Sequence, residues 1–432
     1  MFSKALFGFL LAVALLQCRP TTKKEKEKFP TADSLKVLVP DTSEQQNNSD
    51  TAEADSFELN FAPEQLYPQK VTLPVSGETF NLQLPKGFRI TAAAQVQRRL
   101  RFMAKSTDGR LFATDMYDLT DNKKGRVLIF DKWNADRKAF DTVYTYLNNL
   151  HNPNQIAFYN GYLYVAETGR LARYAYEVGS NIAKDTGQTI ARFPDYGLSY
   201  KYGGWHLTRS VAFYNDKLYV SIGSSCNACV ETETNRAVIL EMNPDGSNSQ
   251  IYARGLRNAV GLRFINGRMW VTGMGRDLLG PDKPEDLFHE VTKDGYYGWP
   301  YYFQYRQRIY EDENFTDSRR AAYVQAPTKA MVGFKAHSAP LGFDFFKYFD
   351  HSALNSAVLV CLHGSTSVWR QRGYEVVRLE KGDNYTPFIT GFLTGKNTTD
   401  RNGRPCDVLQ NDDQSFFVTD DLKGVLYYVW KE

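Results

Sequence analysis

The chain has 432 residues and a formal net charge of +3, the small difference between 52 basic and 49 acidic side chains. No block of lysine and arginine lies in the part expected to fold, so the charge pattern argues against nucleic acid as a partner. Aromatic residues reach 14% of the chain and long helical periodicity is missing, which favours an all-β protein built from half-buried strands and turns.

The first 18 residues resemble a bacterial lipoprotein signal. Lys4 precedes an apolar run from Ala5 to Leu16, which is too short to span a bilayer, and Cys18 follows shortly after. We therefore expect residues 1–18 to be a signal peptide and Cys18 to be lipidated. The alternative is a plain secretory signal in which Cys18 is incidental. With the lipid, we expect the protein to be anchored to a membrane at the bacterial cell envelope, facing the periplasm or the cell exterior.

Residues 19–58 are almost entirely polar and include the charged run from Lys23 to Lys28. Such a segment cannot bury enough apolar surface to offset its ordering entropy, so we expect a disordered tether. We expect the remaining residues 59–432 to form one folded domain.

One pattern recurs six times along this domain: an apolar strand, a turn with Gly, Asn or Asp, and a second strand that ends before a polar loop. The interval between second strands is about fifty residues, with one longer interval between Val271 and Val360. A period of this length, with several strands in each unit, predicts a six-bladed β-propeller. We expect the extra sequence in the long interval to overhang a pocket. The second strands are 110–113, 162–165, 217–220, 268–271, 357–360 and 415–418.

Five cysteines are present. With Cys18 assigned to lipid, Cys226 and Cys229 form a Cys-x-x-Cys pair, and Cys361 and Cys406 remain. Because an exported protein meets oxidising conditions, two disulfides are expected, with the connectivity left open. A zinc site is less favoured, since no second Cys-x-x-Cys accompanies the first.

Residues just before the inner strands of a propeller cluster at one end of its channel. At that repeat position basic and imidazole side chains dominate, and the loops after the second strands add carboxylates. Such a ring suits an anionic ligand bridged to a hard cation such as calcium, although single pairs could instead tie blades together as salt bridges. The two sets are Arg98, Arg99, Arg101, His151, Asn154, His206, Arg209, Arg257, Asn258, His337, Ser338, Arg401 and Arg404, then Asp115, Glu167, Asn227, Asp277, His363, Asp420 and Asp421.

His206 is the candidate general base, because Arg209 follows three residues later and a base must be held near polar and cationic partners. No Gly-x-Ser-x-Gly elbow, Walker loop or dinucleotide-binding glycine fingerprint is present. Serine hydrolysis and nicotinamide chemistry therefore have no visible support.

Several motifs resemble the glucose/sorbosone dehydrogenase family, the soluble PQQ-dependent sugar dehydrogenases that fold as six-bladed propellers. The resemblance runs from about Leu84 to Val429. Its most specific parts are His206-Leu-Thr-Arg209, Val220 to Asn227, Asn243-Pro-Asp-Gly246, Ala253 to Asn258, Gly275-Arg-Asp277, Gly298-Trp-Pro300, Ala336 to Gly342, His363-Gly-Ser365 and Gly403 to Val408.

The resemblance implies oxidation of an aldose or a sorbosone-like sugar, with hydride transfer to PQQ. It implies that His206 takes the hydroxyl proton and that Arg404 pairs with a PQQ carboxylate. The calcium ion beside the cofactor is expected at the carbonyls of Gly275 and Arg276, with Asp277 as a further ligand. Arg257 and Asn258 are expected to contact cofactor or substrate. The full set of expected cofactor contacts is Arg101, Arg209, Arg257, Asn258, His337, His363 and Arg404.

One departure from the family pattern bears on the substrate, and the absence of a haem motif bears on the electron path. After His363-Gly-Ser365 the chain continues with Thr366-Ser-Val-Trp369-Arg370, a shifted or longer loop. The chain looks closer to the sorbosone-type branch than to the glucose enzymes. Val230 follows Cys229, so no Cys-x-x-Cys-His haem motif is present and electrons must pass to a separate acceptor, a quinone or a cytochrome. Two other functions remain open: a calcium-dependent propeller lactonase or other hydrolase, and a non-catalytic carbohydrate-binding lipoprotein.

Overall fold

The computed structural model describes residues 64–97, 99–195, 206–315, 326–365, 371–380, 382–395, 397 and 399–432. All of them belong to the unit Leu35–Glu432. The predicted signal with Cys18, the tether over 19–58, Arg98 and the loop over 366–370 lie outside the described residues. Within the described part of the chain, no helix has the length and apolar character needed to cross a membrane.

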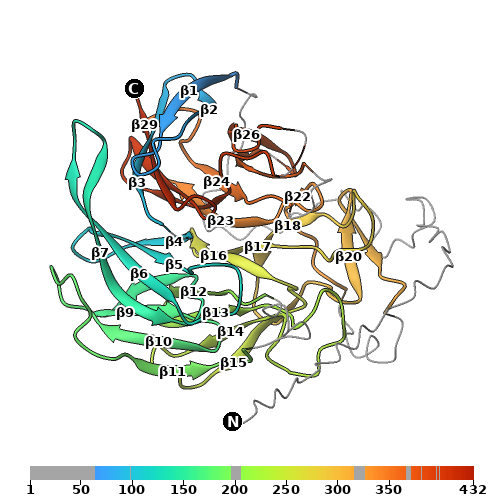
Figure 1. Ribbon diagram of the computed structural model, residues 1–432. Helices are drawn as coiled ribbons and strands as arrows, with labels where there is room; N and C mark the ends of the chain where they lie inside the picture. Colours follow the sequence, from blue (N-terminus) through green and yellow to red (C-terminus); the bar gives the residue numbers. More distant parts are fainter. Residues whose placement is uncertain are drawn as a thin grey trace, which may run out of the picture. The chain divides into compact units, whose positions relative to one another are not determined.

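Six antiparallel sheets follow one another along the sequence (Figure 1). Blade 1 contains β4 (Leu100–Lys105), β5 (Leu111–Asp115), β6 (Gly125–Asn134) and β7 (Ala139–Leu150), and blade 2 contains β8 (Ile156–Tyr159), β9 (Tyr162–Ala166), β10 (Arg170–Ala175) and β11 (Gln188–Arg192). Blade 3 contains β12 (Arg209–Tyr214), β13 (Lys217–Ile222), β14 (Val238–Met242) and β15 (Gln250–Arg254), and blade 4 contains β16 (Ala259–Ile265), β17 (Arg268–Gly273), β18 (Asp286–Val291) and β22 (Val332–Phe334). Blade 5 contains β23 (Pro340–Phe346), β24 (Ala357–Leu362), β25 (Glu375–Leu379) and β26 (Tyr385–Ile389), and blade 6 contains β27 (Pro405–Gln410), β28 (Ser415–Asp420), β29 (Val425–Lys431) and β3 (Phe88–Gln95).

The first strands of the blades contact one another in a closed cycle, from β4 through β8, β12, β16, β23 and β27 back to β4. The six predicted strand pairs are the first and second strands of these blades, so the predicted six-bladed propeller is confirmed. Blade 6 is completed by β3, which comes from the other end of the domain and pairs with β29 so that Ile90 lies opposite Val429. This pairing joins the two ends of the domain within one sheet and closes the ring. A hairpin of β1 (Leu66–Thr72) and β2 (Thr79–Pro85) packs beside β3 and β26.

Neighbouring blades are joined at the axis by side-chain hydroxyls of the second strands. In blade 4, Thr272 Oγ1 accepts a hydrogen bond from the backbone N–H of Gly261 (2.8 Å) and donates to the carbonyl of Leu341 on the first strand of blade 5 (2.7 Å). Because these backbone groups are buried, a hydroxyl at this position satisfies polar groups that water cannot reach. The same link to the next blade is made from the second strand by Thr114 to Asn154, Ser221 to Ala259 and Thr419 to Arg101. In blade 2 it is made by Thr168, which follows β9, to Leu207.

Only one of the two expected disulfides is present among the described residues. Cys226 and Cys229 are bonded to each other, whereas Cys361 and Cys406 are free and buried. Cys361 takes the position that Thr272 has in blade 4, and its side chain packs in the apolar core of blades 5 and 6. Cys406 belongs to a separate small cluster with Phe102, Val260 and Leu341, so the two thiols face different surroundings.

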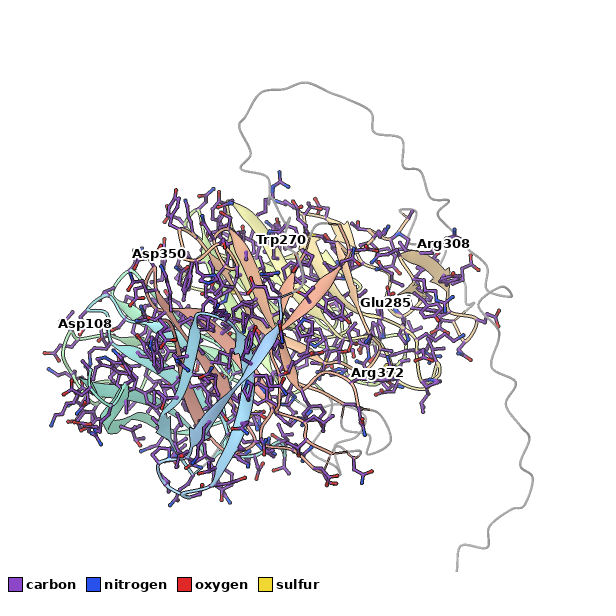
Figure 2. The ribbon with its side chains drawn as sticks, turned by 90° about the horizontal axis from the view of Figure 1, so that it is seen from above. Asp108, Trp270, Glu285, Arg308, Asp350 and Arg372 are labelled. Carbon is purple, nitrogen blue, oxygen red and sulfur yellow. A yellow bond between two sulfur atoms is a disulfide. The ribbon has the colours of Figure 1, made fainter. Side chains whose placement is uncertain are left out.

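The long insertion lies within blade 4, between β18 and β22. Its β19 (Gly295–Tyr296) pairs in parallel with β15 of blade 3, and β20 (Tyr302–Tyr305) and β21 (Arg308–Glu311) form a hairpin. Glu285 holds this hairpin, since its carboxylate accepts a hydrogen bond from Gln304 (3.2 Å). Figure 2 shows Glu285 and Arg308 on the same side of the molecule. The described part of the insertion walls a small cavity of ≈ 60 Å³ beside blade 4 and does not line the main pocket, contrary to the expectation that it would overhang it.

Candidate active site

A pocket of ≈ 320 Å³ lies where the loops before the first strands meet the loops after the second strands. This volume is at the lower end of the range for small-molecule sites. Polar and charged side chains from blades 1, 3, 4, 5 and 6 converge on it, although the residues that supply them are far apart in the sequence. Of the residues predicted for the site, the pocket is lined by Arg101, His206, Arg257, Asn258, Gly275, Asp277, His337, His363 and Arg404.

His206 is held from behind by Ser224. The Nδ1 atom of His206 lies 3.0 Å from the carbonyl oxygen of Ser224 and 2.9 Å from its Oγ. The position before Ser224 must be glycine, because a Cβ on Gly223 would lie 2.6 Å from the His206 Cβ. Burial, reinforced by the nearby charge of Arg257, lowers the pKa of His206 well below 6.5. The imidazole is therefore neutral at physiological pH, which is the form that can accept a proton.

Arg209 lies behind His206 and outside the pocket, although it was expected to contact the cofactor. Its guanidinium donates to the carbonyls of His206 (2.6 Å), Thr208 (2.9 Å) and Pro194 (2.7 Å). It is completely buried, and burial lowers its pKa to about 9. Arg209 thus fixes the backbone that carries His206.

Arg257 and Asn258 lie beside His206, at the start of blade 4. Arg257 donates from Nε to the carbonyl of Asn227 (2.7 Å) and from Nη2 to the Oδ1 atom of the same residue (3.0 Å). Asn258 donates to the sulfur of Met274 at 3.5 Å. Neither partner is charged, so the positive charge of Arg257 remains available to an anionic ligand.

The far side of the pocket contains a buried network around Asp421. His363 Nε2 lies 2.7 Å from Asp421 Oδ1, and Arg101 Nη1 lies 2.9 Å from Asp421 Oδ2. Burial alone would raise the pKa of Asp421, but His363, Arg101 and Arg404 hold it well below its usual range. Burial lowers the pKa of His363 to about 3. Asp421 is therefore ionised, and the neutral His363 donates its Nε2 hydrogen to it.

Arg404 extends from the same corner, and main-chain oxygens hold its guanidinium. It donates from Nε to the carbonyl of His363 (3.1 Å) and from Nη2 to the carbonyl of Gly364 (2.5 Å). It lines the pocket together with both of these residues.

The corner near Gly275 offers oxygen ligands of the kind that a hard cation binds. Asp286 lines the pocket and is 3% exposed; its Oδ1 accepts from the N–H of Gly275 and its Oδ2 from the N–H of Ala339, both at 2.8 Å. Burial raises the pKa of Asp286 to about 6. Among the described residues Asp286 has no ion-pair partner, and a buried carboxylate of this kind is costly unless a cation compensates it. The residues present therefore fit a calcium ion at this corner.

The other predicted calcium residues are placed differently. Asp277 lines the pocket and lies 3.2 Å from Nδ1 of His337, whose Nε2 is 3.1 Å from the carbonyl of Gly280. The side chain of Arg276 forms an ion pair with Asp312 at 2.8 Å and lines the small cavity beside blade 4, and Arg276 is not among the residues that line the main pocket.

Sequence reasoning missed two residues of the site. Ser224 lies in the motif from Val220 to Asn227, but only contact with a separate loop reveals its role. Asp286 is the first residue of the third strand of blade 4, whereas the predicted site residues come from the loops beside the first and second strands.

Comparison with known proteins agrees with this fold. The sequence model of the family described as glucose/sorbosone dehydrogenase matches residues 198–424. An uncharacterized protein of Borreliella burgdorferi is 26% identical over 395 residues, covering 84% of this chain and 94% of that protein.

Two solved structures with bound or named PQQ are also similar. The holo PQQ domain of pyranose dehydrogenase from Coprinopsis cinerea has a TM-score of 0.67 at 16% identity, covering 83% of this chain and 98% of that one. The PQQ-bound aldose sugar dehydrogenase of Streptomyces coelicolor has a TM-score of 0.54 at 15% identity, covering 80% and 99%. A carbohydrate-active enzyme of Trichoderma reesei, in a calcium structure, has a TM-score of 0.67 at 16% identity, covering 81% and 96%. At these identities the likeness shows the shared propeller.

Proposed function

The chain belongs to the glucose/sorbosone dehydrogenase family, and from that premise we propose that it oxidises a sugar with PQQ as cofactor, assisted by calcium. The observation that carries this proposal is the pocket itself. A neutral histidine, His206, faces the same space as three arginines from three blades, Arg101, Arg257 and Arg404. Oxidation of a hydroxyl-bearing carbon needs an acceptor for the hydroxyl proton, and guanidinium groups are suited to hold a multiply anionic cofactor.

The arginines are the residues that would hold the carboxylates of PQQ. The hydrogen-bond acceptors of Arg257 and Arg404 are neutral oxygens, and neither guanidinium forms a direct ion pair with a described residue, so each can still pair with a carboxylate. Arg101 shares Asp421 with His363 and forms the rear of the same wall. Asn258 and His363 add uncharged polar groups. When bound, PQQ supplies the quinone that accepts the hydride.

Calcium would be held at the Gly275 corner, by Asp286 and Asp277 together with main-chain oxygens. A divalent cation there would balance the buried carboxylate of Asp286 and would supply Lewis-acid chemistry. Arg276 contributes only its main chain, because Asp312 holds its side chain.

His206 performs the proton transfer. Its Nδ1 hydrogen points to Ser224, which leaves Nε2 as the basic nitrogen of the ring. The low pKa of His206 keeps that nitrogen unprotonated before the sugar binds. Arg209 fixes the histidine backbone, so the imidazole does not have to reorganise as the hydroxyl proton moves to Nε2.

The electrons would then pass to a separate acceptor, a quinone or a cytochrome, and lipidation of Cys18 would keep the enzyme at the cell envelope near such carriers. This part of the proposal rests on the sequence. Fractionation of cells that express the Cys18→Ser variant tests the anchor, since the variant should leave the membrane fraction.

An absorbance titration of purified protein with PQQ in calcium buffer tests the function. We expect saturable binding that calcium strengthens, followed by dye reduction when a sugar is added. A protein that does not bind PQQ in the presence of calcium is not a PQQ dehydrogenase, and hydrolysis of sugar lactones without any quinone would point to the lactonase alternative.

A further inference from the structure

The loop between β13 and β14 contains a covalent ring next to the pocket. Cys226 and Cys229 form a disulfide with Asn227 and one further residue between them. The ring is anchored on both sides: the N–H and Oγ of Ser225 donate to the two carboxylate oxygens of Glu231, each at 2.7 Å, and Cys226 packs in a small apolar cluster with Trp299. A disulfide that closes so short a ring removes most of the conformations open to the residues inside it.

Asn227 connects this ring to two loops of blade 4. Its Oδ1 accepts from Nη2 of Arg257 (3.0 Å) and from the N–H of Asp277 (2.8 Å), while its Nδ2 donates to the carbonyl of Asp277 (3.2 Å). Its own carbonyl accepts from Nε of Arg257 at 2.7 Å. The remaining hydrogen bond of Arg257, to the carbonyl of Met274, is longer at 3.4 Å. One asparagine therefore sets both the guanidinium of Arg257 and the backbone of Asp277.

We propose that Asn227 is a positioning residue for the pocket, held in place by the Cys226–Cys229 disulfide, and that the affinity of the pocket for a multiply anionic ligand depends on this disulfide. The identity of that ligand as PQQ rests on the proposed function, but the positioning of Arg257 does not.

The chemistry of the asparagine explains why an amide is suited to this place. A carboxylate at position 227 would hold Arg257 equally well but would neutralise it, as Asp421 does for Arg101. The amide gives two donors and an acceptor without a charge, so Arg257 is fixed while its charge remains for the ligand. A preorganised guanidinium loses less rotamer freedom on binding, which increases affinity.

The direct test uses phenylglyoxal, an arginine reagent, on the full-length protein without any cofactor. Arg257 is 7% exposed, so we expect slow labelling in the wild type. In Asn227→Ala the labelling of Arg257 should rise about fivefold or more, measured by peptide mass spectrometry. Arg404 is the internal control, because carbonyls of blade 5 hold it and Asn227 does not touch it.

The disulfide is tested in the same assay. A dithiol reductant opens the bond to two thiols and is itself oxidised to a cyclic disulfide, and Cys226→Ser combined with Cys229→Ser removes the bond permanently. Both treatments should raise labelling of Arg257 and not of Arg404. Asn411→Ala, in the turn between β27 and β28, is the matched control and should change neither labelling rate.

Two outcomes would count against the proposal. Unchanged labelling of Arg257 after reduction would show that the disulfide does not hold Asn227 in place. Equal increases at Arg257 and Arg404 would mean a general loosening of the fold and would overturn the proposal.

The effect of Asn227 on ligand binding is tested by a double-mutant cycle. We expect Asn227→Ala and Arg257→Ala each to weaken PQQ binding at least tenfold, and the double variant to be at most about threefold weaker than Arg257→Ala alone, because the asparagine acts through the arginine. Fully additive losses would overturn the positioning role. If the wild type fails to bind PQQ, the proposed function fails, whereas the labelling result still decides the role of Asn227.

Discussion

Ser224 presents two oxygens to the same nitrogen of His206, its carbonyl at 3.0 Å and its hydroxyl at 2.9 Å from Nδ1. The hydroxyl hydrogen of Ser224 is directed to the carbonyl of Cys226 at 2.7 Å, so toward the histidine this oxygen also acts as an acceptor. Both neighbours of Nδ1 therefore accept, and the hydrogen-bond network assigns the proton to Nδ1 and the lone pair to Nε2.

The contact between Ser224 and His206 predicts different effects for His206→Ala and Ser224→Ala. His206→Ala removes the base and should lower kcat by about 10²- to 10⁴-fold while PQQ binding, measured by titration, stays close to that of the wild type. Ser224→Ala keeps the main-chain acceptor, so the tautomer is preserved and kcat should fall only about tenfold or less. Equal losses in the two variants would contradict the role given to the carbonyl.

The pH dependence of sugar oxidation follows from the protonation of His206. A base must be unprotonated, and burial together with Arg257 lowers the pKa of His206 well below 6.5. In the free enzyme kcat/KM should therefore be constant down to about pH 6.5 and decline only in more acidic buffer. Arg257→Gln removes a repelling charge, so the His206 pKa should rise and the acidic limb should move to higher pH. An acidic limb that stays fixed or moves to lower pH in this variant would contradict the assignment.

The sequence was sufficient to predict the blades because their strand pattern repeats. It was sufficient for most of the pocket because the pocket residues occupy the same position in successive repeats. Arg101, His206, Arg257 and Arg404 each come at or just before an inner strand, and a propeller brings that repeat position to one end of its axis. Arg209 occupies the same kind of position, yet its side chain turns back to the carbonyl of His206. The direction of a side chain depends on its neighbours in space, which the repeat does not specify.

Other features depend on contacts between distant segments and had no local signal. The pairing of β3 with β29 joins segments from opposite ends of the domain, and β3 lies outside the strand pairs that revealed the repeat. The unpaired Cys361 is explained by its register, since it occupies the position after the buried valine where other blades carry a hydroxyl.

Calcium should stabilise the protein through Asp286. Burial raises the pKa of this carboxyl to about 6, so at pH 7.5 it is ionised at a cost that a bound cation would offset. We expect calcium to raise the melting temperature of the cofactor-free wild type by several degrees and that of Asp286→Asn by much less. Asp245→Asn, in an exposed turn, is the control and should respond like the wild type. An unchanged response in Asp286→Asn would place the cation elsewhere.

Acid should destabilise the fold partly through His289. Burial lowers its pKa to about 3, from the ordinary 6.5. Between these values the unfolded chain binds a proton that the folded chain does not, so this contribution to stability is complete above pH 6.5 and is lost as the pH falls. His289→Gln should reduce the slope of the unfolding free energy between pH 4 and 6 by about 1.4 kcal/mol per pH unit, measured by denaturant titration. His351→Gln should change the slope less, because that imidazole is only partly buried.

The hydroxyl links between blades should contribute measurably to stability, and Thr272 is the clearest case. It is completely buried, and its Oγ1 serves the N–H of Gly261 within blade 4 and the carbonyl of Leu341 in blade 5. Thr272→Val keeps the shape but leaves both groups without this partner, so the free energy of unfolding should fall by roughly 1–3 kcal/mol. Thr272→Ser retains the hydroxyl and should be less destabilised than the valine variant, while Thr79→Val, on the exposed hairpin, should stay within about 0.5 kcal/mol of the wild type. If valine and serine were tolerated equally at 272, packing of the side chain rather than its hydrogen bonds would hold blades 4 and 5 together.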